Sequence, residues 1–139
     1  MSTHTWSKRS LGNLDVHPDL RLVADLALKL LETTPVDFIV TDGGRTLKEQ
    51  QDFVARGLSQ TMKSRHLGGF ALDYVAIAPN ADGKMRVTYD DDAMLVVANA
   101  FKAASKQLGI PIEWGGDWNS FQDMPHIQLR AKEYPDVSA

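Results

Sequence analysis

The sequence predicts an α+β fold in which two long helices pack against one face of a small, mainly antiparallel sheet. Two stretches, residues 18–34 and 90–108, place apolar side chains at helical spacing on one face. Shorter runs rich in β-branched and aromatic residues, at 36–41 and 70–77, have turn residues or glycine beside them, as strands do.

The length of the chain fits one domain. With 139 residues it is long enough to bury a core and too short for two domains of ordinary size. We therefore expect a single domain over residues 1–139, with an N-terminal arm at 1–14 that packs through Trp6 and a polar tail at 130–139. The sequence has no Cys, which excludes disulfides and thiolate metal sites.

Charge and hydropathy narrow the classes of partner. A net charge of -3 argues against nucleic acid, because binding to a polyanion needs a basic surface. No apolar run approaches the ~20 residues of a membrane span, and the first residues lack the pattern of a signal peptide. We expect a soluble protein that does not insert into a membrane.

The first half of the chain alternates helix and strand. Pro18 opens the first helix, and His17 just before it is interpreted as a helix-entry residue. The strand 36–41 ends at Gly43-Gly44, and Arg45 follows that turn directly. Thr46 is placed to cap a helix at 47–56, which Gly57 ends. A polar connector at 58–63 then leads into Ser64-Arg65-His66.

The second half begins with the strand 70–77, and a turn at Asn80-Ala81-Asp82-Gly83 predicts a hairpin. The acidic triplet 90–92 is interpreted as the first turn of the second long helix, where it favours the helix dipole, and Gly109 ends this helix. A short strand at 110–114 precedes the Gly-Gly-Asp-Trp run at 115–118. A loop at 119–124 leads to a last strand that begins at His126.

Three side chains predict a metal site. His66, Asp73 and His126 offer two imidazoles and one carboxylate, a ligand set that suits a catalytic zinc with a fourth position open to water. The seven residues from His66 to Asp73 would span about 23 Å on a straight strand, too far for shared coordination. The chain must therefore turn at Gly68-Gly69 so that both residues face one ion.

Zinc chemistry also needs a general base. Asp123 lies three residues before His126 and is our candidate, with Asp117 as the competing one. Arg45, a cation at a strand end, is placed to orient a carboxylate or steady an oxyanion. The alternative for Arg45 is an ion pair with Asp42 or Glu49.

These residues carry a family resemblance. The pattern Ser-x-His-x-x-Gly-x-Ala-x-Asp, followed by Asp-x-x-His, resembles the zinc peptidases of the D-Ala-D-Ala carboxypeptidase and phage L-alanyl-D-glutamate endopeptidase superfamily; the matching positions are Ser64, His66, Gly69, Ala71, Asp73, Asp123 and His126. The runs 6–11, 16–18, 113–118 and 125–129 are similar to the endopeptidase branch in particular. The resemblance therefore covers nearly the whole chain.

The resemblance implies the hedgehog and D-Ala-D-Ala-peptidase type of fold, with the zinc ligands on the face of the sheet opposite the helices. It implies a monomeric endolysin-like enzyme that cuts the L-Ala-D-Glu bond of the peptidoglycan stem peptide and lyses bacteria. The candidate substrate contacts are Arg45, Ser64, Trp114 and Asp117. For Trp114, a place in the core is an equal alternative.

The same resemblance places synthesis in the host cytoplasm, with access to the wall after a holin-type partner has breached the membrane. Two other functions stay open at this point. One is a D-Ala-D-Ala carboxypeptidase or dipeptidase, and the other is a non-catalytic relative that uses zinc for wall binding.

Overall fold

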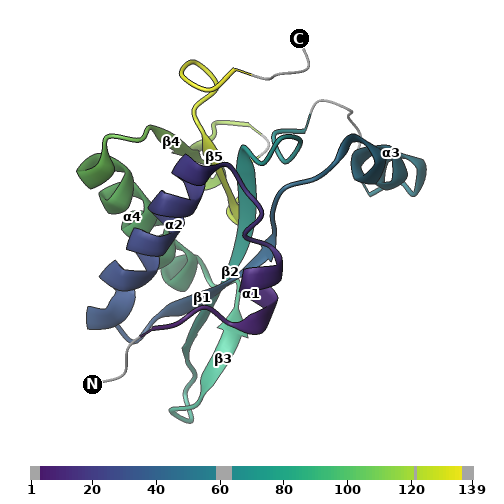
Figure 1. Cartoon of the computed structure of the whole chain (residues 1–139). Helices are drawn as coiled ribbons and strands as arrows, with labels where there is room; N and C mark the ends of the chain where they lie inside the picture. The colour runs from purple at the N-terminus through teal and green to yellow at the C-terminus, as the bar shows by residue number, and fades with distance from the viewer. Residues whose placement is uncertain (1–3, 59–63, 121, 136–139) are drawn as a thin grey trace.

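A five-stranded antiparallel sheet forms the centre of the protein (Figure 1). The computed structural model describes residues 4–58, 64–120 and 122–135. The strand order is β1-β2-β5-β4, and β3 pairs with the far end of β2. The strands are β1 Asp37–Asp42, β2 Ala71–Pro79, β3 Met85–Thr88, β4 Ile112–Trp114 and β5 His126–Leu129. All four strand ladders are antiparallel, which confirms the predicted α+β class.

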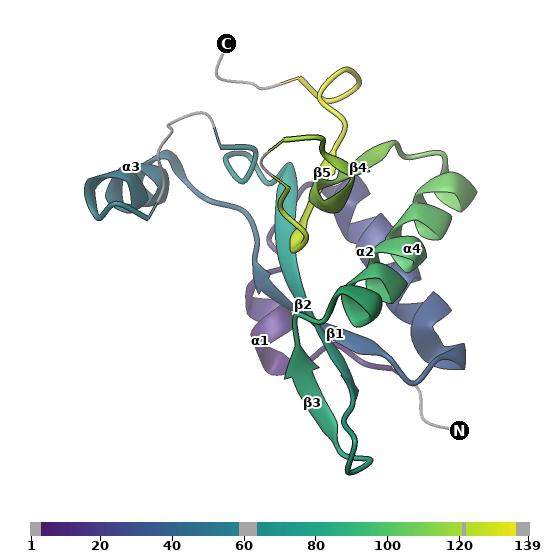
Figure 2. The ribbon, with the colours of Figure 1, turned by 180° about the vertical axis from the view of Figure 1, so that it is seen from behind.

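Two helices cover one face of this sheet. Helices α2 and α4 lie side by side in both views (Figures 1 and 2) and pack against each other, and α4 also packs against β2. The helices of the fold are α1 Lys8–Gly12, α2 Pro18–Leu30, α3 Leu47–Ala55 and α4 Asp91–Leu108. Helix α3 stands apart from this body in both views. Within the described residues, no helix is both long and apolar enough to traverse a bilayer.

The helix ends follow the predicted signals. The His17 ring accepts a hydrogen bond from the Asp19 N–H at the start of α2, which confirms its role as a helix-entry residue. Thr46 and Glu49 form a reciprocal capping box at the start of α3. Gly109 takes the left-handed conformation after α4, and the acidic triplet lies at the start of this helix as expected.

The core lies between the sheet and helices α2 and α4. Leu72, Tyr74 and Ala76 of β2 point into it, and the Tyr74 hydroxyl donates to the Met94 carbonyl at 2.8 Å. Because side chains alternate along a strand, Asp73 projects from the opposite face. The predicted placement of the metal ligands away from the long helices is therefore confirmed for β2.

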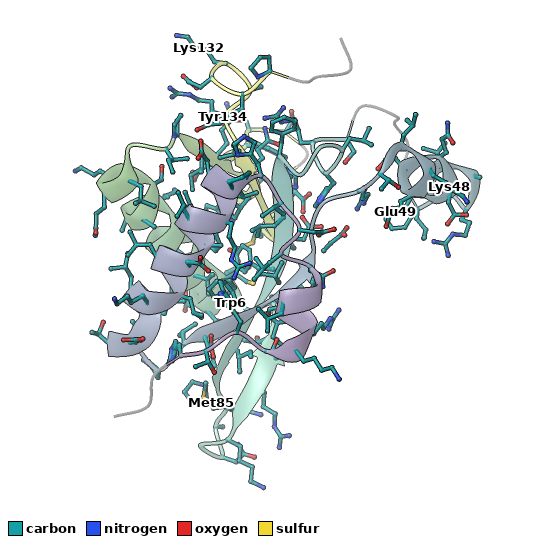
Figure 3. The ribbon with its side chains drawn as sticks, in the orientation of Figure 1. Trp6, Lys48, Glu49, Met85, Lys132 and Tyr134 are labelled. Carbon is teal, nitrogen blue, oxygen red and sulfur yellow. The ribbon has the colours of Figure 1, made fainter. Side chains whose placement is uncertain are left out.

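Residues near both ends of the described chain pack onto the body. The Trp6 ring meets Phe38 edge-on at 5.4 Å, and its indole N–H donates to Asp25, so the N-terminal arm packs through its aromatic residue as expected. The arm also contains α1, which was not predicted. Near the other end lies Tyr134, which is labelled in Figure 3. Its hydroxyl donates to Asp19 at 2.6 Å. Of the expected connector at 58–63, residues 59–63 lie outside the described part of the chain.

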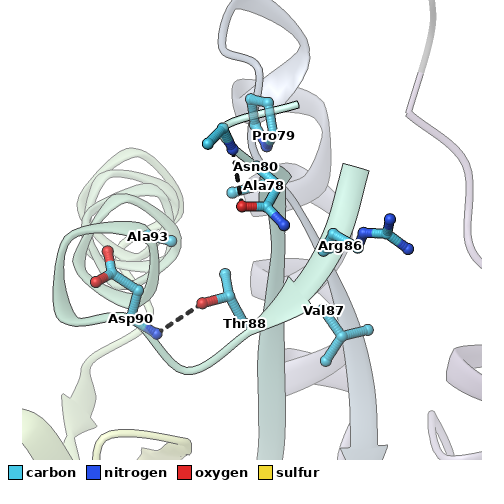
Figure 4. Close-up of a pocket in the computed structure, with 9 residues that line it drawn as sticks. Ala78, Pro79, Asn80, Arg86, Val87, Thr88, Asp90 and Ala93 are labelled. Atoms are coloured by element: carbon cyan, nitrogen blue, oxygen red, sulfur yellow. Dashed lines mark hydrogen bonds between the residues drawn. The ribbon is translucent and has the colours of Figure 1, made fainter. Parts of the chain in front are cut away.

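A cavity of about 360 Å³ lies between the β2–β3 hairpin and the start of α4 (Figure 4). Its lining includes Arg86, Thr88, Asp90 and Ala93. Asp73 lies near the start of β2, whereas the cavity is lined by Ala78 and Pro79 at its end. The cavity is therefore separate from the predicted metal site.

Candidate metal centre

The three predicted ligands come together on one face of the sheet. His66 lies in the loop before β2, Asp73 lies on β2, and His126 is the first residue of β5. Asp73 and His126 are direct partners in the antiparallel ladder. One ligand atom from each of the three lies within 4.8 Å of the others, so the group is able to hold a metal ion.

The loop between His66 and Asp73 makes the turn that the spacing required. Gly68 and Gly69 both have positive φ, at 76° and 78°, where residues with a Cβ are strained. The Gly69 N–H donates back to the His66 carbonyl at 3.1 Å. The turn returns His66 to the start of β2, where its ring faces Asp73.

The carboxylate of Asp73 lies between the two imidazoles. Its Oδ1 is 3.4 Å from Nε2 of His66 and 3.3 Å from Nδ1 of His126. Burial raises the pKa of Asp73, but the contacts with His126 and His66 outweigh it, and the net pKa lies well below the ordinary value. Oδ1 is nevertheless buried without a geometrically satisfactory hydrogen bond. A buried carboxylate oxygen that faces two ring nitrogens fits the binding of a divalent cation.

The outer nitrogen of each imidazole has an acceptor. Nδ1 of His66 lies 2.7 Å from the Gly43 carbonyl, and Nε2 of His126 lies 2.8 Å from Oε1 of Gln128. When these outer nitrogens donate, the lone pairs of Nε2 on His66 and Nδ1 on His126 point toward Asp73. The site then offers two nitrogen ligands and one oxygen ligand.

Asp123 lies beside this group. Its Oδ2 is 4.0 Å from Nδ1 of His126, and its side chain is 50% exposed. Burial and the charge of Asp73 raise the pKa of Asp123, whereas His126 and His66 act in the opposite direction. The main chain at Asp123 is fixed because its N–H donates to the Gly115 carbonyl at 3.0 Å. An acid here is accessible to water and adjacent to the ligands.

Arg45 lies in a network beneath the His66 loop. Its guanidinium forms an ion pair with Asp42 and donates hydrogen bonds to Gln50 at 3.0 Å and to Ser64 at 3.5 Å. The side chain of Arg45 is 12% exposed. The ion pair with Asp42 was one of the two predicted alternatives. The other, Glu49, instead accepts from the Thr46 N–H. Contacts of Arg45 and Ser64 with a substrate stay a prediction.

The two other candidate substrate contacts lie near β4. Trp114 is 6% exposed and donates its indole N–H to the Met124 carbonyl, so it belongs to the core. Asp117 pairs with Lys102 at 2.7 Å. Both residues line a cavity of about 290 Å³ together with Trp118. The Trp118 ring lies 5.3 Å from the His126 ring, so Trp118 forms a wall beside the candidate metal ligands.

Sequence reasoning missed the polar partners of His126. Gln128 contacts the outer nitrogen of His126, and its own Nε2 donates to Glu113 at 2.9 Å. The signal for Gln128 was present, because a residue two positions along a strand shares a face with its neighbour. The place of Glu113 depended on the pairing of β4 with β5, which the sequence did not reveal.

A sheet that presents two imidazoles and a carboxylate around one point, with a further acid beside them, is typical of metal-dependent hydrolases. The family described as phage L-alanyl-D-glutamate peptidase matches residues 1–136. The chain therefore belongs to this family, and the predicted resemblance is confirmed.

Individual relatives agree with this family. The chain is 36% identical to the L-alanyl-D-glutamate peptidase of Escherichia phage T5, over 86% of this chain and 83% of that protein. It is 39% identical to the L-alanyl-D-glutamate peptidase of Listeria phage A118, over 95% of this chain but 44% of the longer relative. The crystal structure of the Serratia marcescens L-Ala D-Glu endopeptidase ChiX superposes with a TM-score of 0.77 at 39% identity, covering 94% of this chain and 93% of ChiX.

Proposed function

We propose that this protein is a zinc-dependent endopeptidase that hydrolyses the L-Ala-D-Glu bond in the stem peptide of peptidoglycan. The choice of bond is supported by the family and by the names of the phage and Serratia relatives. The observation that carries the metal is the buried Oδ1 of Asp73, which faces a nitrogen from each of two imidazoles. Nitrogen and carboxylate ligands without any thiolate suit zinc in a catalytic site.

The residues have distinct tasks in this proposal. His66, Asp73 and His126 would hold the zinc ion, which when bound polarises the scissile carbonyl and makes water a stronger nucleophile at neutral pH. Asp123 would accept a proton from the attacking water and deliver it to the nitrogen of the leaving amine. The raised pKa of Asp123 suits both steps, because an acid-base group works best with a pKa near the operating pH.

The scissile bond is tested by digesting defined muropeptides with the purified protein and identifying new termini by mass spectrometry. We expect products that begin with D-Glu. Release of D-Ala alone would refute the assigned bond and favour a D-Ala-D-Ala carboxypeptidase. If the purified protein binds zinc but cleaves none of these substrates, the result would favour a non-catalytic wall-binding relative.

The role of Asp123 is tested by Asp123→Ala. General acid-base catalysis contributes about 10²- to 10⁴-fold, so we expect turnover to fall by that factor while zinc stays bound. Asp117→Ala is the matched control, because Asp117 pairs with Lys102 rather than with the ligand group. Normal turnover in Asp123→Ala together with a large loss in Asp117→Ala would transfer the role of base to Asp117.

We further propose that the protein reaches the wall from the host cytoplasm once a holin-type partner has breached the membrane. Its kinship with peptidases of two phages supports this route. Expression in a host with and without a membrane-permeabilising protein tests it, and lysis is expected only with the second protein present.

A further inference from the structure

The two imidazoles of the metal centre are held from behind in different ways. Nδ1 of His66 meets a main-chain carbonyl, that of Gly43, which only accepts hydrogen bonds. Nε2 of His126 meets the side-chain amide of Gln128, which is able to present either an oxygen or an NH2 group. The ring nitrogen that His126 leaves free therefore depends on which way this amide faces.

Glu113 determines the direction of the amide. The contact between Gln128 and Glu113 is 2.9 Å long, and a carboxylate only accepts hydrogen bonds. The NH2 group of Gln128 must therefore face Glu113, so that its Oε1 faces His126. Nε2 of His126 meets its oxygen acceptor at 2.8 Å, whereas Asp73 Oδ1 beside Nδ1 makes no geometrically satisfactory hydrogen bond, so the geometry places the hydrogen of the neutral ring on Nε2. The lone pair of Nδ1 is then left to face Asp73 Oδ1, 3.3 Å away.

Strand geometry keeps these three groups in line. Gln128 follows His126 by two residues on β5, so both side chains leave the same face of the sheet. Glu113 is the direct partner of Gln128 in the ladder between β4 and β5. Gln128 is only 7% exposed, so water has little access to compete for its amide.

We propose that Gln128 and Glu113 are positioning residues that hold His126 in the Nε2–H tautomer and thereby present Nδ1 to the metal ion. We call these three side chains the His126 relay. The identity of the metal rests on the proposed function. The tautomer, by contrast, is a property of the metal-free protein and is measurable without any peptidase assay.

The first experiment compares Gln128→Leu with the unchanged protein. Leucine has a similar size but neither donates nor accepts. Nitrogen-15 NMR of labelled histidines, in chelator and at a pH where the rings are neutral, reports the tautomer. We expect the Nε2–H form at His126 in the unchanged protein and a mixture of both tautomers in Gln128→Leu. Zinc affinity, measured by competition with a chromogenic chelator, should fall about 10- to 100-fold.

The control is Gln107→Leu, the same substitution at an exposed position on α4. This variant should keep both the tautomer and the zinc affinity. The relay is refuted if Gln128→Leu leaves the tautomer unchanged, whatever happens to affinity. It is also refuted if Gln107→Leu weakens zinc binding as much as Gln128→Leu does.

A second pair of variants tests the direction of the amide. Gln128→Glu alone sets two carboxylates against each other and should weaken zinc binding. Adding Glu113→Gln supplies an NH2 group at position 113 that donates to one oxygen of the new carboxylate at 128, whose other oxygen accepts from His126. The double variant should therefore recover most of the lost affinity. Failure to recover overturns the proposal, and this test stands even if Gln128→Leu does not fold.

Failure of the relay and failure of the proposed function give different results. If the unchanged protein binds no zinc, the proposed function fails, while the tautomer measurement still decides the relay. If zinc binds tightly and Gln128→Leu changes neither the tautomer nor the affinity, the relay alone is overturned.

Discussion

Replacing Gly69 by alanine should destabilise the protein more than a glycine-to-alanine change at any open position. Gly69 has a φ of 78°, a conformation that costs residues with a Cβ roughly 1–2 kcal/mol. A Cβ added here would also lie 2.8 Å from the His17 nitrogen and 3.0 Å from the Val16 Cα. Both are main-chain atoms, so the two segments must separate, and overpacking of this kind costs about 1–3 kcal/mol. The sum predicts a loss of about 2–5 kcal/mol for Gly69→Ala.

Gly109→Ala is the matched control. Gly109 also has a positive φ, 69°, but no atom lies within 4 Å of its added Cβ. This variant should therefore lose only the backbone term, roughly 1–2 kcal/mol. Urea denaturation of both variants in the presence of chelator measures the free energy of unfolding without a contribution from bound metal.

Gly69→Ala should also weaken zinc binding, which Gly109→Ala should not. The reason is that the Gly69 N–H donates to the His66 carbonyl and the Gly69 carbonyl accepts from the His17 N–H at 2.9 Å, so a displaced Gly69 moves the loop that carries His66. Equal losses of stability in the two variants would refute the close packing of Gly69 on residues 16–17. Normal zinc affinity in a destabilised Gly69→Ala would refute the link to the metal site.

Two further predictions concern metal removal and pH. Protein in free zinc at 100 times the dissociation constant should have a free energy of unfolding about 2.7 kcal/mol higher than protein in chelator. Thermal melts with zinc and with chelator should therefore differ for the unchanged protein, and Asp73→Ala should abolish this difference. Burial raises the pKa of Tyr74 in the folded protein above its unfolded value of about 10. The neutral phenol therefore contributes its full stability below pH 10, and this contribution is lost as the pH rises from 10 toward the folded pKa. Stability should fall above pH 10, by up to about 1.4 kcal/mol per pH unit for this group, and a Tyr74→Phe variant with the same slope would contradict this.

The parts of the fold that were predicted depend on local patterns. The apolar faces of α2 and α4 repeat at helical spacing over several turns, and glycine or a capping side chain marks their ends. The ligand group was predictable because the chain has only four His and a glycine turn separates His66 from Asp73. The five-residue helix α1 was missed because one helical turn is too short to show a period.

The parts that were missed depend on contacts between distant segments. The pairing register of β1 with β2 shifts between Val40 and Asp42, next to the ion pair of Asp42 with Arg45. No local pattern in the sequence predicts this irregularity. Similarly, Glu113 meets Gln128 only because β4 and β5 pair in one register. A one-residue slip would place Glu113 on the other face of the sheet.

The glycine pairs of the site have a packing role that turn signals in the sequence do not predict. In the sequence, Gly43 and Gly44 indicate only the end of a strand. In the structure, a Cβ on Gly43 would lie 1.9 Å from the Asn13 carbonyl oxygen, and a Cβ on Gly44 would lie 2.4 Å from the Asp15 carbonyl oxygen. Together with Gly69 against residues 16–17, they let two loops close onto one stretch of main chain at 13–17. One of these loops supplies the Gly43 carbonyl that contacts His66, and the other carries His66 itself. The separation of the proposed metal ligands is therefore governed partly by a segment that contributes no ligand. Substitutions that add a Cβ at these glycines should weaken the proposed metal binding although none of the glycines belongs to the ligand group.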